Sequence, residues 1–151
     1  MSPASCSKKM EIHLKLIGSL LVILSLVHII FPRYFKWAED LEKISLINRQ
    51  MMYIHTFFIA LVVMLIGLLC ITSSHELCNT KLGANISLGL SIFWLIRLVI
   101  QFFGYSPSLW KGKKMETIIH VIFALLWLYL GTIFGLVWLQ SNYIFTTIVQ
   151  L

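Results

Sequence analysis

Four long apolar runs constrain this chain more than any other feature of its sequence. A helix rises about 1.5 Å per residue, so roughly 20 helical residues cross the hydrocarbon layer of a bilayer, which is about 30 Å thick. Each of the four runs is about that long, and together they occupy over half of the 151 residues. The sequence therefore predicts four transmembrane helices, at about residues 14–31, 52–72, 86–105 and 117–139.

The composition favours a membrane protein over a soluble one. Hydrophobic residues make up 59% of the chain and charged residues only 12%, more apolar surface than one soluble core of this size can bury. The segments between the runs are too short for a separate soluble domain. We therefore expect an all-α four-helix transmembrane bundle, with residues 1–151 forming a single integral membrane domain in the lipid bilayer.

The connection over residues 32–52 carries a helical pattern of its own. Pro32 is expected to end the first spanning helix, because proline lacks the backbone donor that a helix needs. Apolar residues then recur at helical spacing, with charged residues on the opposite side. These apolar positions are Phe35, Ala38, Leu41, Ile44, Ile47 and Met51. The pattern predicts a short amphipathic helix that lies in the membrane interface or caps the bundle.

Positive charge predicts the orientation of the helices. We call the N-terminal side of the membrane face A; the connections 32–52 and 106–116 then lie on the opposite side, face B. Face B carries more lysine and arginine than face A, so the positive-inside rule places face B in the cytoplasm and both termini in the periplasm of a bacterial inner membrane. The net charge of +6 needs no nucleic acid partner, since basic flanks meet anionic lipid head groups.

The few polar residues inside the runs gather near face B. Counting along antiparallel helices places three histidines and a glutamine within roughly two turns of that face, and Arg97 about one turn deeper. The residues of this layer are His28, His55, Arg97, Gln101 and His120. Trp94 and Tyr105 share the helical stripe of Arg97. This common depth is the strongest functional signal in the sequence.

Arg97 needs a partner, because an arginine inside a spanning helix costs at least about 2.5 kcal/mol on insertion scales. None of the four runs contains an acidic residue. The remaining partners are Gln101, a tyrosine, a neutral histidine, backbone carbonyls, an acidic residue that folds in from face B, or a bound anion. Arg97 also has a purely structural interpretation, in which it reaches the head groups or pairs with Glu116.

Three classes of function fit this layer. In the first, two histidines ligate haem b between flat aromatic rings such as Trp94 and Trp127, or a quinone accepts hydrogen bonds from His120, Gln101 and Tyr105. In the second, His28, His55 and His120 bind a transition metal. In the third, the layer only fixes helix packing in an accessory or lipid-binding protein, which associates with other membrane subunits or with further copies of itself.

Two resemblances accompany these hypotheses. The succession of Phe93-Trp94, Arg97, Gln101 and Tyr105, followed by Trp110 and His120, resembles that of uncharacterised small bacterial four-helix membrane proteins, which implies the fold and no functional residue. The segment His28 to Phe35 is similar to part of the HemJ-type protoporphyrinogen oxidases, which are small helical haem proteins. His28 ends its helix here instead of beginning it, so no role is carried over.

Overall fold

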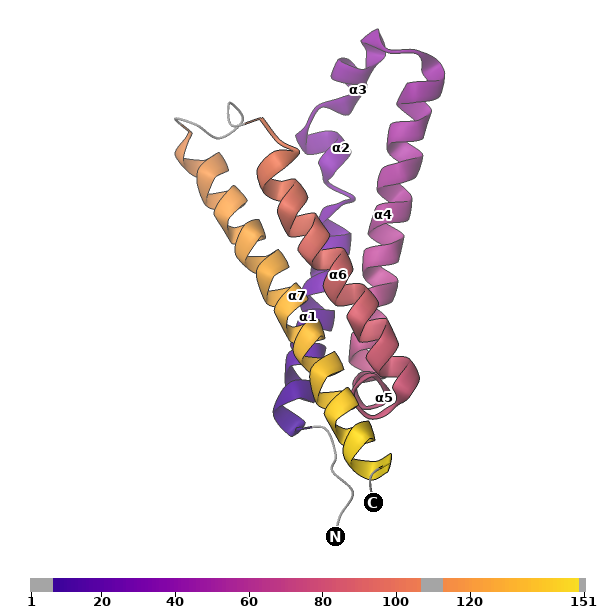
Figure 1. The fold of residues 1–151 in the computed structure, drawn as a ribbon. Helices are drawn as coiled ribbons and strands as arrows, with labels where there is room; N and C mark the ends of the chain where they lie inside the picture. Colours follow the sequence, from indigo (N-terminus) through magenta and orange to yellow (C-terminus); the bar gives the residue numbers. More distant parts are fainter. Residues whose placement is uncertain (1–6, 107–112, 150–151) are drawn as a thin grey trace. The chain divides into compact units, whose positions relative to one another are not determined.

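Four long helices dominate the computed structural model, which describes residues 7–106 and 113–149, with side chains as far as residue 142. Each is long and apolar enough to cross a membrane, in the last helix over Lys114–Asn142. Their bounds are α1 Lys8–Val27, α4 Leu46–Thr72, α6 Lys81–Phe103 and α7 Lys114–Val149 (Figure 1). The predicted all-α fold with four transmembrane helices is confirmed. Trp110 and Lys111, which the sequence assigns to the face B connection, lie outside the described residues.

The helix ends differ from the predicted ones because hydrophobicity marks the membrane and not the helix. α4 begins at Leu46, six residues before the apolar run, and Asn48, Arg49 and Gln50 continue the same backbone hydrogen bonding outside it. α1 begins at Lys8 and ends at Val27, well before Pro32. Arginine and glutamine have good helix propensity, so a polar segment such as this one extends a helix beyond the apolar run at little cost.

Three short elements replace the single amphipathic helix that the spacing suggested between α1 and α4. They are α2 Phe31–Tyr34, α3 Trp37–Asp40 and the 3₁₀ helix η1 Leu41–Lys43. Lys36 has a φ of 49°, in the left-handed region, and separates α2 from α3. Ile44 is extended and ends η1. A short helix between the first two spanning helices is thus present, but these two backbone breaks prevent one continuous helix.

The chain divides into two compact units, residues 1–13 with 75–151 and residues 14–74. In the first unit α6 packs side by side against α7 as an antiparallel pair (Figure 1). Ser91 Oγ donates to the Gly131 carbonyl at 2.7 Å, and Ser141 Oγ donates to the Cys78 carbonyl at 2.6 Å. Small residues allow backbones to approach, and serine hydroxyls then bond across the contact.

The first turns of α1 also belong to this unit. Glu11 Oε1 lies 3.1 Å from His75 Nδ1 on the short helix α5, Ser74–Asn79. His13 Nδ1 lies 2.8 Å from the Tyr129 hydroxyl on α7. Both contacts lie outside the layer that the sequence analysis identified. They tie the beginning of the chain to segments that are far away in the sequence.

In the second unit two glycines bring α1 and α4 into backbone contact. A Cβ atom added at Gly18 would lie 2.6 Å from the Gly67 carbonyl oxygen, and one added at Gly67 would lie 2.8 Å from the Gly18 oxygen. Real Cβ atoms essentially never come closer than 3.0 Å to another heavy atom. The two helices can therefore cross at this distance only because both positions lack a side chain.

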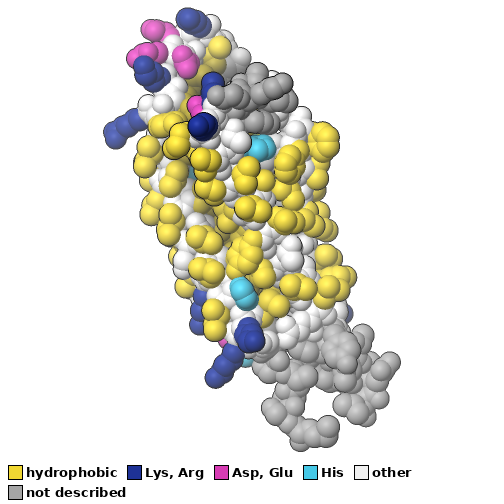
Figure 2. All heavy atoms as spheres, turned by 90° about the vertical axis from the view of Figure 1, so that its left-hand side faces the viewer, with side chains coloured by type: hydrophobic (Ala, Val, Ile, Leu, Met, Phe, Trp, Pro, Cys, Tyr) yellow, Lys and Arg dark blue, Asp and Glu magenta, His cyan; other side chains and the backbone are white. Residues whose placement is uncertain are grey.

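The outward side chains of the spanning helices are largely hydrophobic. In the most apolar window of α4 only 17% of the residues are buried, and Phe57 is 62% exposed. Hydrophobic side chains cover much of the visible face in Figure 2. Apolar surface of this extent is costly in water, and a bilayer removes that cost.

Candidate functional site

The structure joins Arg97, Gln101 and His120 in a line that links α6 to α7. Arg97 Nη1 donates to Gln101 Oε1 at 3.3 Å, and Gln101 Nε2 lies 2.9 Å from His120 Nδ1. Gln101 stands in the last turn of α6 and His120 in the second turn of α7, so the antiparallel packing brings them level. We call these three residues the polar relay.

The direction of the relay follows from the chemistry of arginine. A guanidinium can only donate, so the Gln101 oxygen faces Arg97 and its amide nitrogen faces His120. That nitrogen donates, so His120 Nδ1 accepts and the imidazole proton is on Nε2. The relay therefore holds His120 as the neutral Nε2-protonated tautomer.

Aromatic rings surround the guanidinium of Arg97. Its Cζ lies 5.3 Å from the centre of the Trp127 ring and 5.8 Å from that of Tyr105, within the range of cation–π attraction. Trp94 stacks on Trp127 with ring centres 4.9 Å apart and planes 7° apart. The two indoles are only 2% and 5% exposed, so the half-buried guanidinium lies against a buried aromatic stack.

The relay and the stack contain more donors than acceptors. The indole Nε1 atoms of Trp94 and Trp127 are buried and have no acceptor among the residues that the structure describes. Within the same part of the chain Arg97 forms no ion pair, and the contact between Glu11 and His75 is the one bridge to a carboxylate. A buried donor without an acceptor is unfavourable, so this excess of donors requires an explanation.

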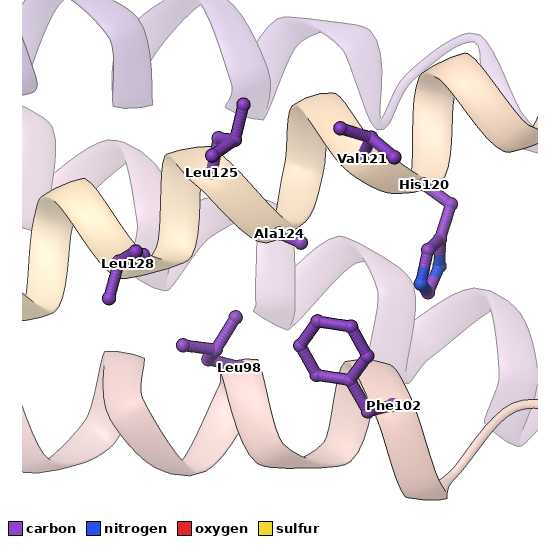
Figure 3. Close-up of a pocket in the computed structure, with 7 residues that line it drawn as sticks. All are labelled: Leu98, Phe102, His120, Val121, Ala124, Leu125 and Leu128. Carbon is purple, nitrogen blue, oxygen red and sulfur yellow. The ribbon is translucent and has the colours of Figure 1, made fainter.

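A hollow of about 280 Å³ opens beside the relay, between α6 and α7. His120 is the one polar residue in its lining and belongs to the relay as well. Figure 3 shows His120 and Phe102 near each other at one end of the hollow, and Leu98 and Leu128 at the other. The full lining is Leu98, Phe102, His120, Val121, Ala124, Leu125 and Leu128. The surface of the hollow is almost entirely apolar, which suits a hydrocarbon chain, and His120 joins it to the relay.

His28 and His55 belong to the other compact unit, and each ring bonds to its own helix region. The His28 Nδ1 donates to the Leu24 carbonyl at 2.8 Å, and the His55 Nδ1 donates to the Met51 carbonyl at 2.9 Å. His28 also packs on Phe31, with ring centres 4.7 Å apart. These bonds fix the orientation of both rings, His28 just after the end of α1 and His55 in the third turn of α4.

The predicted three-histidine metal centre finds no support in the structure. No group of three or more histidine, cysteine, aspartate or glutamate residues that could hold a metal ion occurs in 7–106 and 113–149. A metal site needs ligands that converge from several elements. The structure does bring together other residues singled out from the sequence: direct contacts connect Arg97, Gln101, Tyr105 and His120, and Trp94 joins them through Trp127.

Two parts of the site were not assigned to it from the sequence. Trp127 was considered only for a haem face or for packing, although it lies seven residues after His120 on the same side of α7 and contacts Arg97. Phe102 packs edge-on against His120 with ring centres 5.7 Å apart. Phe102 follows Gln101 directly in the sequence, and this position could have indicated that Phe102 belongs to the site.

No protein-family model, curated protein or solved structure matches the chain. The likeness to HemJ-type proteins accordingly adds no role for His28.

Proposed function

We propose that this small integral membrane protein binds a membrane lipid between α6 and α7, as a non-catalytic lipid-binding subunit. The observation that carries the proposal is the position of His120, which lies in the polar relay and also at one end of the apolar hollow. A lipid head would meet the donors of the relay, and its chain would pack against Leu98 and Leu128. The geometry thus matches the two halves of an amphipathic molecule.

The position of Arg97 supports binding at this end of the pair. It lies six residues before the end of α6 at Phe103, roughly 9 Å along the helix axis. A long arginine side chain at that depth reaches toward the membrane interface, where lipid head groups lie. The apolar walls of the hollow run from the relay along α7 toward Leu128, which is the direction of a lipid chain.

A quinone is the second candidate, favoured by the pairing of Gln101 with His120 beside Phe102. Its carbonyl oxygens accept hydrogen bonds, and its ring would pack on Phe102. Haem binding has less support, because the relay contains one histidine, His120, where the predicted haem site uses two. Mass spectrometry of the molecules that copurify with the protein would distinguish a lipid from a quinone.

Filling the hollow should expel the ligand. Ala124→Phe puts a ring into the space that the ligand chain would occupy, and we expect retained lipid to fall about tenfold, the equivalent of about 1.4 kcal/mol. Native mass spectrometry of the protein in mild detergent measures the lipid-bound fraction. Thr132→Phe, at an exposed position of the same helix, is the matched control and should retain lipid like the wild type. Equal retention by both variants would contradict the proposal.

A further inference from the structure

We infer that the relay and the tryptophan stack bind an oxyanion, and that the lipid of this site is an anionic phospholipid. The inference rests on the proposed lipid-binding function and names the class of lipid. Its source is the charge and hydrogen-bonding balance of five residues in one compact unit: Trp94, Arg97, Gln101, His120 and Trp127.

The first step is the missing counter-charge of Arg97. Within residues 7–106 and 113–149 the guanidinium contacts one amide oxygen and two aromatic faces, none of which carries a full negative charge. Glu116 lies only four residues before His120 on α7, yet it forms no ion pair with Arg97. A cation inside a spanning helix is normally paired. The described residues supply no such pair, so we expect the counter-charge from a ligand.

The second step is the geometry of the donors. A guanidinium has five N–H groups in a planar fork, and one of them reaches Gln101. The indole N–H groups of Trp94 and Trp127 add two buried donors without an acceptor. A phosphate oxygen accepts several hydrogen bonds and pairs with the arginine fork in a bidentate manner. One phosphodiester at Arg97 would therefore give acceptors to the guanidinium and, once the buried stack opens toward it, to the two indole N–H groups.

The third step is the charge of the lipid head group, which favours an anionic lipid over a zwitterionic one. A choline or ethanolamine head adds a positive charge, for which neither the relay nor the stack offers a carboxylate. That charge would also lie near Arg97 and repel it. A head group with a glycerol, by contrast, leaves the net negative charge of the phosphate in place. The apolar hollow beside His120 favours a phosphate that carries acyl chains over a dissolved one.

The test compares lipids with identical acyl chains on the full-length protein. Protein in mild detergent receives equimolar phosphatidylglycerol and phosphatidylcholine, and native mass spectrometry counts the bound molecules. We expect phosphatidylglycerol to be retained about tenfold better. Arg97→Gln should abolish this preference. Trp127→Phe keeps an aromatic ring but removes the indole N–H, and it should reduce the preference. Arg33→Gln removes an exposed cation of α2 and is the control for general charge.

Each outcome separates the two proposals. If neither lipid is retained, the lipid-binding function fails together with the inference. If both lipids are retained equally, the function stands and the oxyanion assignment is wrong. If millimolar inorganic phosphate displaces the lipid, the oxyanion of this site is a dissolved phosphate, and the assignment of a phospholipid is wrong. Should Arg97→Gln not fold, Trp127→Phe decides the matter, since an unchanged preference in this variant would overturn the inference.

Discussion

Gly18→Leu is expected to lower the free energy of unfolding by at least about 2 kcal/mol, because it forces α1 and α4 apart. Even a single Cβ at this position would lie 2.6 Å from the Gly67 carbonyl oxygen and equally near Ile71 Cγ1. A backbone oxygen cannot rotate out of the way as a side chain can. Unfolding by a denaturing detergent, followed by circular dichroism, measures the change.

The control for this prediction is Gly89→Leu. Gly89 also lies in a spanning helix, but a Cβ there would meet nothing within 4 Å. Leucine has the better helix propensity, so this variant should be as stable as the wild type or slightly more stable. If Gly18→Leu and Gly89→Leu unfold alike, the close contact of α1 with α4 is not a determinant of stability.

Opposite effects are expected from two substitutions of Gln101. Gln101→Leu removes the oxygen that accepts from Arg97 and the N–H that donates to His120, at a position only 7% exposed. It should lower the free energy of unfolding by about 1–3 kcal/mol. Gln101→Glu instead gives Arg97 a carboxylate, and charge-assisted bonds are roughly twice as strong as neutral ones. This variant should keep at least the stability of the wild type, as measured by the same unfolding assay.

Gln101→Glu should at the same time lose the preference for anionic lipid, because the new carboxylate neutralises the guanidinium. His120 would then have to donate, which moves its proton from Nε2 to Nδ1. Nitrogen NMR of labelled histidine detects this exchange. Gln50→Leu, at an exposed position of α4, is the control for loss of an amide and should change neither stability nor lipid preference. A stable Gln101→Leu variant would refute the role of the relay.

The sequence predicted the spanning helices because the cost of exposing apolar surface to water leaves a run of about 20 such residues few alternatives. It did not predict where the helices end. Residues such as Asn48 and Lys8 are polar, and their helical state depends on propensity and neighbours instead of on hydropathy. The left-handed backbone of Lys36 was also not predictable, because lysine has no special preference for that conformation.

The site was predictable where it depends on helix geometry alone. Counting residues along antiparallel helices placed Arg97, Gln101 and His120 at similar depths, and the structure joins them. Depth does not specify which way a side chain points or which helices are neighbours. His28 and His55 share the predicted depth, but their rings bond to backbone carbonyls of their own segments. The hollow depends on side-chain packing between two helices, which spacing along one chain does not encode.

The contacts at the start of α1 have a consequence for the synthesis of this protein. Glu11 meets His75, and His13 meets Tyr129, which is 116 residues further along the chain. A ribosome has therefore made most of the protein before His13 meets Tyr129, whereas His75, halfway along the chain, reaches Glu11 sooner. The contact of His13 with Tyr129 therefore forms late in synthesis and cannot accompany the insertion of the first helix.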